Sequence, residues 1–388
     1  MTESCVNMGQ VQTDMMQDST PALRVDVVSH DALDDRSRAL WMQLRASNPA
    51  LYSPYFSVSY ADQVSALRDD IRTIIISQFG KTIAFLPVQG GTFAQPVGAP
   101  MTDYHGIICA PHTELDIQDI LAQAGIGSFH FSGLIGNGAA GEGEMIAATD
   151  VSMGAQAWRA GKNKSYRRML KDNNRRARKA QSEVGDITAK FNVTDTQQFD
   201  QLLTWKRDKF AVTGKYDVLG AGWTEDLLRR LYAAQSPDLR CEMHVLYFDG
   251  RMAAADMGLT DGETFHSWMV GYDAEFQIYS PGSQLLEQLI DAAPSLGYRN
   301  IDLGPGLDGY KKHYSGIEQQ AHSGFIAATG PAAALSRAYG AAERMGEKAN
   351  FEGLTKLRRR YSQIAACDRT TKGRAAAMLS AIKNAGKS

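Results

Sequence analysis

The stretch ETFHSWMVGYDAEFQIYSPGSQLLEQLIDAAPSLGYRNIDLGPGLDGYKKHYSG, residues 263–316, decides the fold of this chain. It predicts a strand over 264–270, a turn over 279–282, a helix over 283–295 and a short strand over 300–303. The turn consists of small or rigid residues that suit a helix start, namely Ser280, Pro281, Gly282 and Ser283. Unpaired N–H groups and the positive end of the helix dipole at such a start attract an anion such as a pyrophosphate. An ordinary capped helix start is the alternative.

A second signal is an internal repeat. Residues 73–86 (TIIISQFGKTIAFL) and 243–259 (MHVLYFDGRMAAADMGL) each read as strand, glycine turn, strand, and the turn glycines Gly80 and Gly250 are 170 positions apart. Residues 122–133 and 292–304 also correspond, with Gly127 and Gly297 again 170 apart. The spacing predicts two copies of one α/β unit, of which the second carries the better anion loop.

Length and composition exclude several classes of protein. The 388 residues suggest two or three domains, and 44 % hydrophobic residues can supply a substantial core. No apolar run approaches the ~20 residues that span a bilayer. The four cysteines lie far apart, so we expect neither a disulfide framework nor a zinc site, and no other metal. Residues 1–20 are polar and are expected to be a disordered leader. A cytoplasmic protein is predicted.

The net charge of −2 conceals two basic blocks. Residues 161–180 hold 9 Lys or Arg and one Asp, and residues 331–388 hold 12 Lys or Arg against 4 Asp or Glu. Two compact blocks on an acidic body indicate two separate anion-facing surfaces and not general affinity for DNA.

The first block predicts a helix with Arg168, Arg175 and Arg178 on one face. That face would bind a phosphate-rich partner, such as a nucleotide sugar, a lipid-linked sugar or the anionic inner-membrane surface. A solvated face is the alternative. In the next predicted helix, over 195–212, Trp205 and Lys206 are candidates for the substrate cleft, with core packing as the alternative.

The second block belongs to an Ala-rich helical tail, which need not contribute to either core. Its Arg-rich run, at positions 358–360, 369 and 374, is a candidate for binding cyclic di-GMP, with a solubilising or membrane-surface tail as the alternative.

Two segments resemble the CelD-type acetyltransferase family, FemAB-related members of the GNAT superfamily found in exopolysaccharide and holdfast biosynthesis. One is the basic block at 166–185, and the other carries Trp268, Asp273, Phe276, Tyr279 to Gly282, Leu285, Gly297, Asp302 to Gly304, Tyr310 and Lys311. The resemblance covers roughly residues 20–330. It implies an α/β (α+β) fold of tandem GNAT-like units over 21–160 and 161–330, the second opening with the basic helix. A helical tail would follow over 331–388.

The resemblance also implies an acetyl-CoA-dependent N-acetyltransferase that modifies a sugar, an amino sugar or a lipid-linked sugar. The acetyl-CoA would then be held by Tyr279, Ser280, Pro281, Gly282, Ser283 and Lys311. By its position after the last strand, Tyr310 is the candidate acid for the leaving thiolate, with Tyr314 next.

A general base must also be found. His266 lies in the strand before the anion loop and has a suitable pKa range, although a structural histidine is the alternative. Asp302 and Asp256 are further candidates, and Asp302 would equally cap the loop that follows it. Two rival functions stay open. One is a Fem-type aminoacyl transferase acting on a peptidoglycan precursor, and the other is a non-catalytic cyclic di-GMP effector of polysaccharide assembly.

Overall fold

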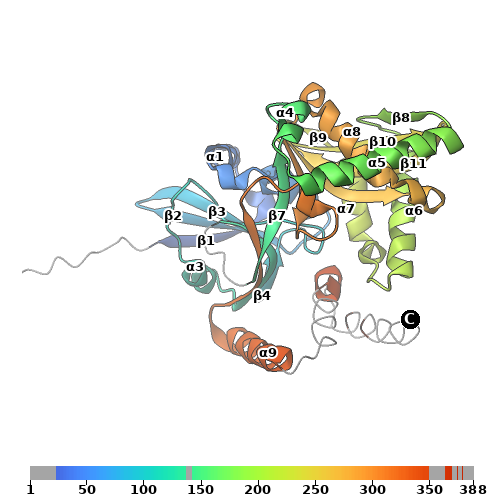
Figure 1. The fold of residues 1–388 in the computed structure, drawn as a ribbon. Coiled ribbons are helices and arrows are strands. Elements are labelled where there is room, and N and C mark those ends of the chain that lie inside the picture. The colour runs from blue at the N-terminus through green and yellow to red at the C-terminus, as the bar shows by residue number, and fades with distance from the viewer. Residues whose placement is uncertain (1–22, 137–141, 349–362, 369–373, 375–377, 379–388) are drawn as a thin grey trace, which may run out of the picture.

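The computed structural model describes residues 23–136, 142–348, 363–368, 374 and 378 (Figure 1). The whole predicted leader, residues 1–20, and most of the tail's Arg-rich run lie outside these ranges. The described strands form one mixed sheet (Figure 1). From one edge to the other its order is β1 (Arg24–Ser29), β2 (Ile71–Gln78), β3 (Lys81–Gly90), β4 (Phe93–Pro96), β6 (Ser128–Leu134), β14 (Gln320–Ala327), β7 (Glu142–Asp150), β13 (Asn300–Pro305), β12 (Thr264–Tyr272), β11 (Arg251–Thr260), β10 (Leu239–Phe248) and β8 (Ile187–Lys190).

Helices cover both copies of the repeat. Those that belong to the N-terminal copy are α1 (Asp35–Ser47), α2 (Val58–Ser65) and α3 (Ile117–Gln123). Those that belong to the C-terminal copy are α4 (Ala155–Ala160), α5 (Lys164–Glu183), α6 (Thr196–Val212), α7 (Trp223–Ala233) and α8 (Pro281–Leu296), and α9 (Gly330–Lys348) follows. Two short strands, β5 (Ile108–Cys109) and β9 (Gln235–Ser236), pair with β3 and β10.

Counted inward from the two edges, the strands of one copy correspond to those of the other: β1, β2, β3, β4 and β6 match β8, β10, β11, β12 and β13. This correspondence confirms the duplication. Each copy has one parallel pair, β4 with β6 and β12 with β13, and the other ladders are antiparallel. The hairpin glycines Gly80 and Gly250 have φ of +72° and +76°. A bulge follows each turn, because Ile83 and Ala253 are skipped in the pairing of β3 with β2 and of β11 with β10. Ile83 and Ala253 are again 170 positions apart.

The second predicted landmark is wrong by two residues. Gly297 ends α8 with φ +87° and stands three residues before β13. In the N-terminal copy that place belongs to Gly125, with φ +70°, three residues before β6, and not to Gly127. Both positions need a left-handed residue after a helix, for which glycine is preferred.

The two copies exchange strands at the centre of the sheet. β14 follows the C-terminal copy in sequence, yet it pairs with β6 of the N-terminal copy. β7 pairs with β14 on one side and with β13 on the other. Each copy therefore completes the sheet of the other. The division of the chain at residues 160 and 330 stays a prediction.

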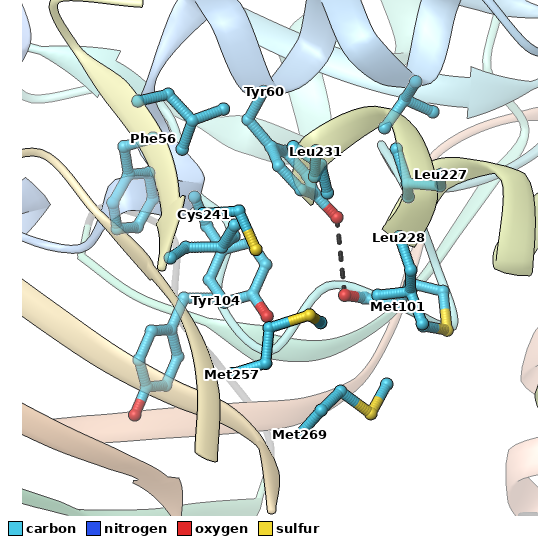
Figure 2. Packing of buried hydrophobic residues seen from close by; sticks show 14 of the residues in the cluster. Phe56, Tyr60, Met101, Tyr104, Leu227, Leu228, Leu231, Cys241, Met257 and Met269 are labelled. Atoms are coloured by element: carbon cyan, nitrogen blue, oxygen red, sulfur yellow. Dashed lines mark hydrogen bonds between the residues drawn. The ribbon is translucent and has the colours of Figure 1, made fainter. Parts of the chain in front are cut away.

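A shared core joins the copies (Figure 2). Buried side chains from the N-terminal copy pack against α7 and the strands of the C-terminal copy; those labelled are Phe56, Tyr60, Met101 and Tyr104 on one side and Leu227, Leu228, Leu231, Cys241, Met257 and Met269 on the other. The Tyr60 hydroxyl donates to the Met101 carbonyl at 3.4 Å. Burial of this apolar surface holds the copies together at about 25 cal/mol per Å² removed from water.

The first part of the tail contributes to the core, which the sequence alone left open. α9 packs on β14 and β6, where Ala332, Ala333 and Ser336 are buried and the Ser336 hydroxyl donates to that of Ser128 at 2.8 Å. Further on, Ile364 and Cys367 are also buried. Small alanine side chains allow a helix to pack closely on a sheet. The net charge of the segment does not indicate this packing.

No helix in the described ranges is long and apolar enough to cross a membrane. Nor does the described part of the chain bring together His, Cys, Asp and Glu side chains in a group that could hold a metal ion.

Candidate active site

The site begins where β12 and β13 separate. Their parallel ladder joins only three pairs of residues, the last being His266 with Asp302. β12 then continues along β11 to Tyr272, whereas β13 stays paired with β7 on its other side as far as Pro305. Trp268 is skipped in the pairing of β12 with β11, which is a β-bulge. Beyond His266, the edge of β12 that faces away from β11 has no β13 partner and can bind a ligand through its backbone.

The β12 strand leads to the predicted anion loop. A short 3₁₀ helix, η5 (Ala274–Tyr279), brings the chain to Ser280, which has φ +55° and makes no side-chain cap for α8. The helix begins at Pro281, earlier than predicted, with Gly282 next. The N–H groups of Ser283 and Gln284 donate to the Ser280 carbonyl, and Pro281 has no N–H. Since no side chain caps this end, the Gly282 N–H is left as a donor for an anion.

The basic helix α5 lies beside this loop. Arg176 donates from Nη1 to the Ser280 hydroxyl at 2.7 Å, and the Tyr279 hydroxyl donates to Glu183 at 2.8 Å. A guanidinium therefore stands next to the uncapped end of α8, where it would add to the attraction of a phosphate. Sequence reasoning missed Arg176, because the spacing of the basic residues placed Arg168, Arg175 and Arg178 on one face of the helix and left Arg176 off it.

The three predicted arginines lie elsewhere on α5. Arg168, Arg175 and Arg178 are exposed, and Arg175 is paired with Asp172 at 2.6 Å. Asp172 also pairs with Arg176 at 2.9 Å, four residues along the helix. That i, i+4 spacing was the available sign that Arg176 is held in place. The predicted contact of the other three with a substrate stays a prediction.

A buried group of charges lies at the base of the separating strands. His266 is fully buried, with Nε2 2.9 Å from Asp103 Oδ2 and Nδ1 3.6 Å from Asp302 Oδ2. Asp302 also accepts from the hydroxyls of Tyr52 at 2.6 Å and Tyr104 at 3.0 Å. Three of these residues, Tyr52, Asp103 and Tyr104, come from the N-terminal copy. Sequence reasoning missed them because no motif marks them.

The surroundings of His266 fix its charge. Burial alone would lower its pKa, but the carboxylates of Asp302 and Asp103 raise the pKa of His266 to about 9. Burial acts the other way on Asp302, yet the charge of His266 and the hydrogen bond from Tyr52 keep the pKa of Asp302 below its usual value. An imidazolium must lose a proton before it can act as a base. The base role of His266 stays a prediction that its surroundings disfavour at neutral pH.

Asp256 offers a better proton acceptor. Burial raises its pKa to about 7, against the opposing effects of the Ser267 hydroxyl and the charges of His266 and Lys206. Ser267 donates to one carboxylate oxygen at 2.7 Å, while the other, Oδ1, has no hydrogen-bond partner. A carboxyl group that titrates near neutral pH can accept a proton from a substrate.

The predicted residues of the second helix lie near this carboxylate. Lys206 donates to the Val270 carbonyl at 3.3 Å, and burial lowers the pKa of its ammonium, although Asp256 acts against the shift. Trp205 is half-buried and packs close to Gly271 of β12. Both therefore contact the strand that borders the opening.

Tyr310 and Lys311 follow β13. Tyr310 is 42 % exposed, and local burial together with the charge of Asp256 raises the pKa of its hydroxyl to about 12. Lys311, in the short helix η6 (Lys311–His313), donates to the Pro305 carbonyl at 3.3 Å. A side chain placed on Gly304 would lie 3.6 Å from both Lys311 Nζ and Asp103 Oδ2, so these two groups border the same space. The predicted contact of Lys311 with a phosphate stays a prediction.

Comparisons with known proteins place the site in a class. Residues 164–312 match the family model described as an acetyltransferase (GNAT) domain. This part of the chain is a GNAT-type acyltransferase domain, which takes its acyl group from an acyl-CoA, and the protein is an acyltransferase with GNAT-like folds in tandem. No protein with a curated description matches the sequence.

Solved structures of similar fold are remote. FemX is 8 % identical with a TM-score of 0.46, over 77 % of this chain and 97 % of its own. A tandem GNAT protein from the clavulanic acid biosynthesis pathway is 10 % identical with a TM-score of 0.44, over 78 % of this chain and 97 % of its own. The C-terminal domain of a putative lysylphosphatidylglycerol synthetase from Agrobacterium fabrum is 13 % identical with a TM-score of 0.43, over 77 % and 95 %. Such distant likenesses say nothing about what this chain binds.

Proposed function

We propose that this protein transfers an acetyl group from acetyl-CoA to the amine of a sugar or amino-sugar intermediate in exopolysaccharide or adhesin synthesis. The observation that carries the proposal is the continuous path along β12. It runs from the buried carboxylates, past the bulge at Trp268, to the uncapped start of α8 beside Arg176. The resemblance to CelD-type enzymes supplies the sugar and the biosynthetic setting.

The donor would lie along this path. Its pyrophosphate would bind the Gly282 N–H in the first turn of α8, together with the Arg176 guanidinium. Its extended arm would follow the unpaired edge of β12. The thioester carbonyl would then reach the bulge, where the backbone N–H of Trp268 can polarise it.

The acceptor would enter from the side of the N-terminal copy. Carboxylates of Asp103 and Asp256 attract an ammonium group, and the half-buried ring of Trp268 offers a surface for a sugar ring. Asp256 accepts a proton from the bound ammonium group, and the neutral amine nitrogen so formed bonds to the carbonyl carbon. The carbon–sulfur bond then breaks, the leaving thiolate takes a proton from Tyr310, and the second proton that the nitrogen loses passes through solvent to the Tyr310 phenolate.

Two alternative functions would use different binding surfaces of this chain. A Fem-type aminoacyl transferase would use the basic helix α5 to bind aminoacyl-tRNA, and a regulatory protein would bind cyclic di-GMP at the tail. Peripheral attachment of α5 to an anionic inner membrane is compatible with the transferase, because its outer face carries exposed arginines. The Arg-rich run proposed for cyclic di-GMP lies outside the described residues except for Arg374.

Separate calorimetric titrations with acetyl-CoA, aminoacyl-tRNA and cyclic di-GMP test the proposal, followed by assays of acetyl transfer to amino sugars. We expect saturable binding of acetyl-CoA alone. If Tyr310 is the acid, Tyr310→Phe should lower kcat by about 10²-fold with little change in acetyl-CoA affinity. Binding of aminoacyl-tRNA but not acetyl-CoA would favour the Fem-type reading and overturn ours.

A further inference from the structure

A polar cavity of about 270 Å³ lies between α5 and α8, on the α5 side of the anion loop. Its lining is unusually rich in groups that both donate and accept hydrogen bonds. Four side-chain amides and two carboxylates face it, from Asn173, Asn174, Gln284, Gln288, Glu287 and Asp291. A cavity between packed helices is more often closed by apolar side chains, so this lining calls for an occupant.

Two buried oxygen atoms in this lining have no partner. Asn173 is 6 % exposed, and its Oδ1 accepts no hydrogen bond. Gln284 is 4 % exposed; its Nε2 donates to the Tyr279 carbonyl at 2.8 Å, and its Oε1 accepts nothing. Buried acceptors without donors are costly to keep, which indicates that a molecule with donor groups satisfies them.

The charges in the lining are fixed and favour a neutral or cationic occupant. Arg159 pairs with Glu287 at 2.8 Å and also with Asp291. Glu287 accepts in addition from the hydroxyls of Tyr166 at 2.9 Å and Tyr314 at 2.8 Å. One guanidinium faces two carboxylates, so the cavity repels an anion. The phosphates of an acyl-CoA are therefore excluded from it.

We propose that this cavity is a second binding site, for a single sugar ring that is neutral or carries an amine. Neighbouring hydroxyl groups on a ring match planar amides and carboxylates, which offer donors and acceptors side by side. The volume lies just below the roughly 300 Å³ at which pockets for drug-sized ligands begin, which suits one small polar molecule. The site goes beyond the proposed transfer reaction.

The cavity is joined to the donor site through Gln284. The same side chain that offers Oε1 to the cavity holds the Tyr279 carbonyl of the anion loop with its Nε2. A bound sugar would fix the orientation of this amide and, with it, the loop that precedes α8. We therefore expect sugar binding to tighten acetyl-CoA binding, and by linkage the reverse.

The test is a titration of the full chain, without acetyl-CoA, by calorimetry and ligand-observed NMR. The probes are glucosamine, N-acetylglucosamine and glucose 6-phosphate. We expect saturable binding of glucosamine, of N-acetylglucosamine or of both, and no binding of glucose 6-phosphate. Asn173→Leu should weaken that binding at least 10-fold, whereas Gln181→Leu, which changes an exposed amide on the same helix, should leave it unchanged.

Two further variants keep the outcome decisive. Gln284→Met replaces the second acceptor with a side chain of similar length, and it must also weaken binding if Asn173→Leu fails to fold. Asp256→Asn alters the proposed acceptor cleft and not the cavity. Sugar binding that survives both cavity variants and disappears in Asp256→Asn belongs to the acceptor cleft and overturns the proposal. Absence of any sugar binding to the unaltered protein, which would leave only water in the cavity, overturns it as well.

Discussion

The two copies share a fold but differ where the parallel strands separate. In the C-terminal copy, β12 runs past β13 with a free edge. In the N-terminal copy, β4 ends at Pro96 and the chain returns beside β6, where His105 forms a parallel bridge with Leu134. The His105 N–H donates to the Gly133 carbonyl at 3.0 Å, and its carbonyl accepts from Ile135 at 2.9 Å. The opening that would hold an acyl-CoA is filled by the chain itself.

The helix starts differ in the same sense. At α3, the Asp116 carboxylate accepts from the N–H groups of Gln118 at 2.8 Å and Asp119 at 3.3 Å. At α8, no side chain caps the first turn and a guanidinium stands alongside. One copy supplies its own anion, and the other leaves the place for a ligand. The N-terminal copy has instead become part of its neighbour's site, to which it contributes Asp103 and Tyr104.

The largest expected effect tests whether the copies are independent at all. Deleting residues 331–388 removes α9 from the N-terminal copy and uncovers buried positions on β6 and β14. We expect Tm to fall by more than about 10 °C, or cooperative unfolding to be lost, because the lost burial is worth several kcal/mol. Thermal melting followed by circular dichroism measures this, with deletion of 379–388 alone as the control. A truncated protein with the Tm of the full chain would show that the tail is dispensable.

A second pair of variants compares the two helix starts directly. Gly282→Val changes the second position of α8, where an added Cβ meets only Val270 at 3.7 Å, so the fold should survive. Its bulk should hinder a phosphate at the N–H groups and weaken acetyl-CoA binding by about 10- to 100-fold. Gln118→Val changes the corresponding exposed position of α3 and should have no effect. Calorimetry with acetyl-CoA measures both variants. If a folded Gly282→Val protein binds acetyl-CoA as tightly as the unaltered protein, the loop does not bind the donor.

A third comparison separates neighbours on α5. Arg176→Ala removes the guanidinium bound to Ser280 and should weaken acetyl-CoA binding by about 5- to 10-fold, with an effect that shrinks at high salt. Arg175→Ala, one residue away and exposed, should leave acetyl-CoA binding unchanged. Charge reversal at Arg175 and Arg178 should instead raise KM for a phosphorylated acceptor. Equal losses of acetyl-CoA affinity in the two alanine variants would mean that α5 acts only through its overall charge.

The sequence predicted the repeat and the helix at the Ser-Pro-Gly turn well, because both depend on local signals. Glycine turns and the Ser-Pro-Gly helix start are set by backbone geometry within a few residues. The strand exchange of β7 and β14 could not be predicted, since pairing between distant strands leaves no local pattern. The contribution of Asp103 was equally hidden, because its partner His266 lies 163 residues away.

The sequence alone does not show the charge states that burial decides. A lone strand histidine suggests a base near neutral pH, but two carboxylates hold His266 as an imidazolium. Asp256 looked like a secondary candidate until its burial, 4 % exposed, raised its pKa to about 7. Neither environment can be read from residues adjacent in the chain, since the neighbours come from both copies.

The smallest expected effect concerns the charge that the N-terminal copy places beside His266. The pKa of His266 is about 9 in the folded protein and 6.5 without perturbation. Because the folded state holds this proton more tightly, the associated stability is complete below pH 6.5 and is lost as pH rises through 9. Asp103, Asp302 and Asp256 all face this imidazolium, and only Asp103 belongs to the N-terminal copy.

Asp103→Asn should therefore flatten the pH dependence of stability between pH 6.5 and 9, by a difference on the order of 1 kcal/mol, because it removes one of the carboxylates that raise the pKa of His266. Denaturant titrations at the two pH values measure the difference for the unaltered protein and the variant. Asp116→Asn, which changes the α3 cap, serves as the control, since that carboxylate is exposed and is not among those that raise the pKa of His266. If Asp103→Asn and the unaltered protein lose the same stability over this interval, then Asp103 does not hold the proton on His266. The two copies would then meet in a shared apolar core without sharing an electrostatic site.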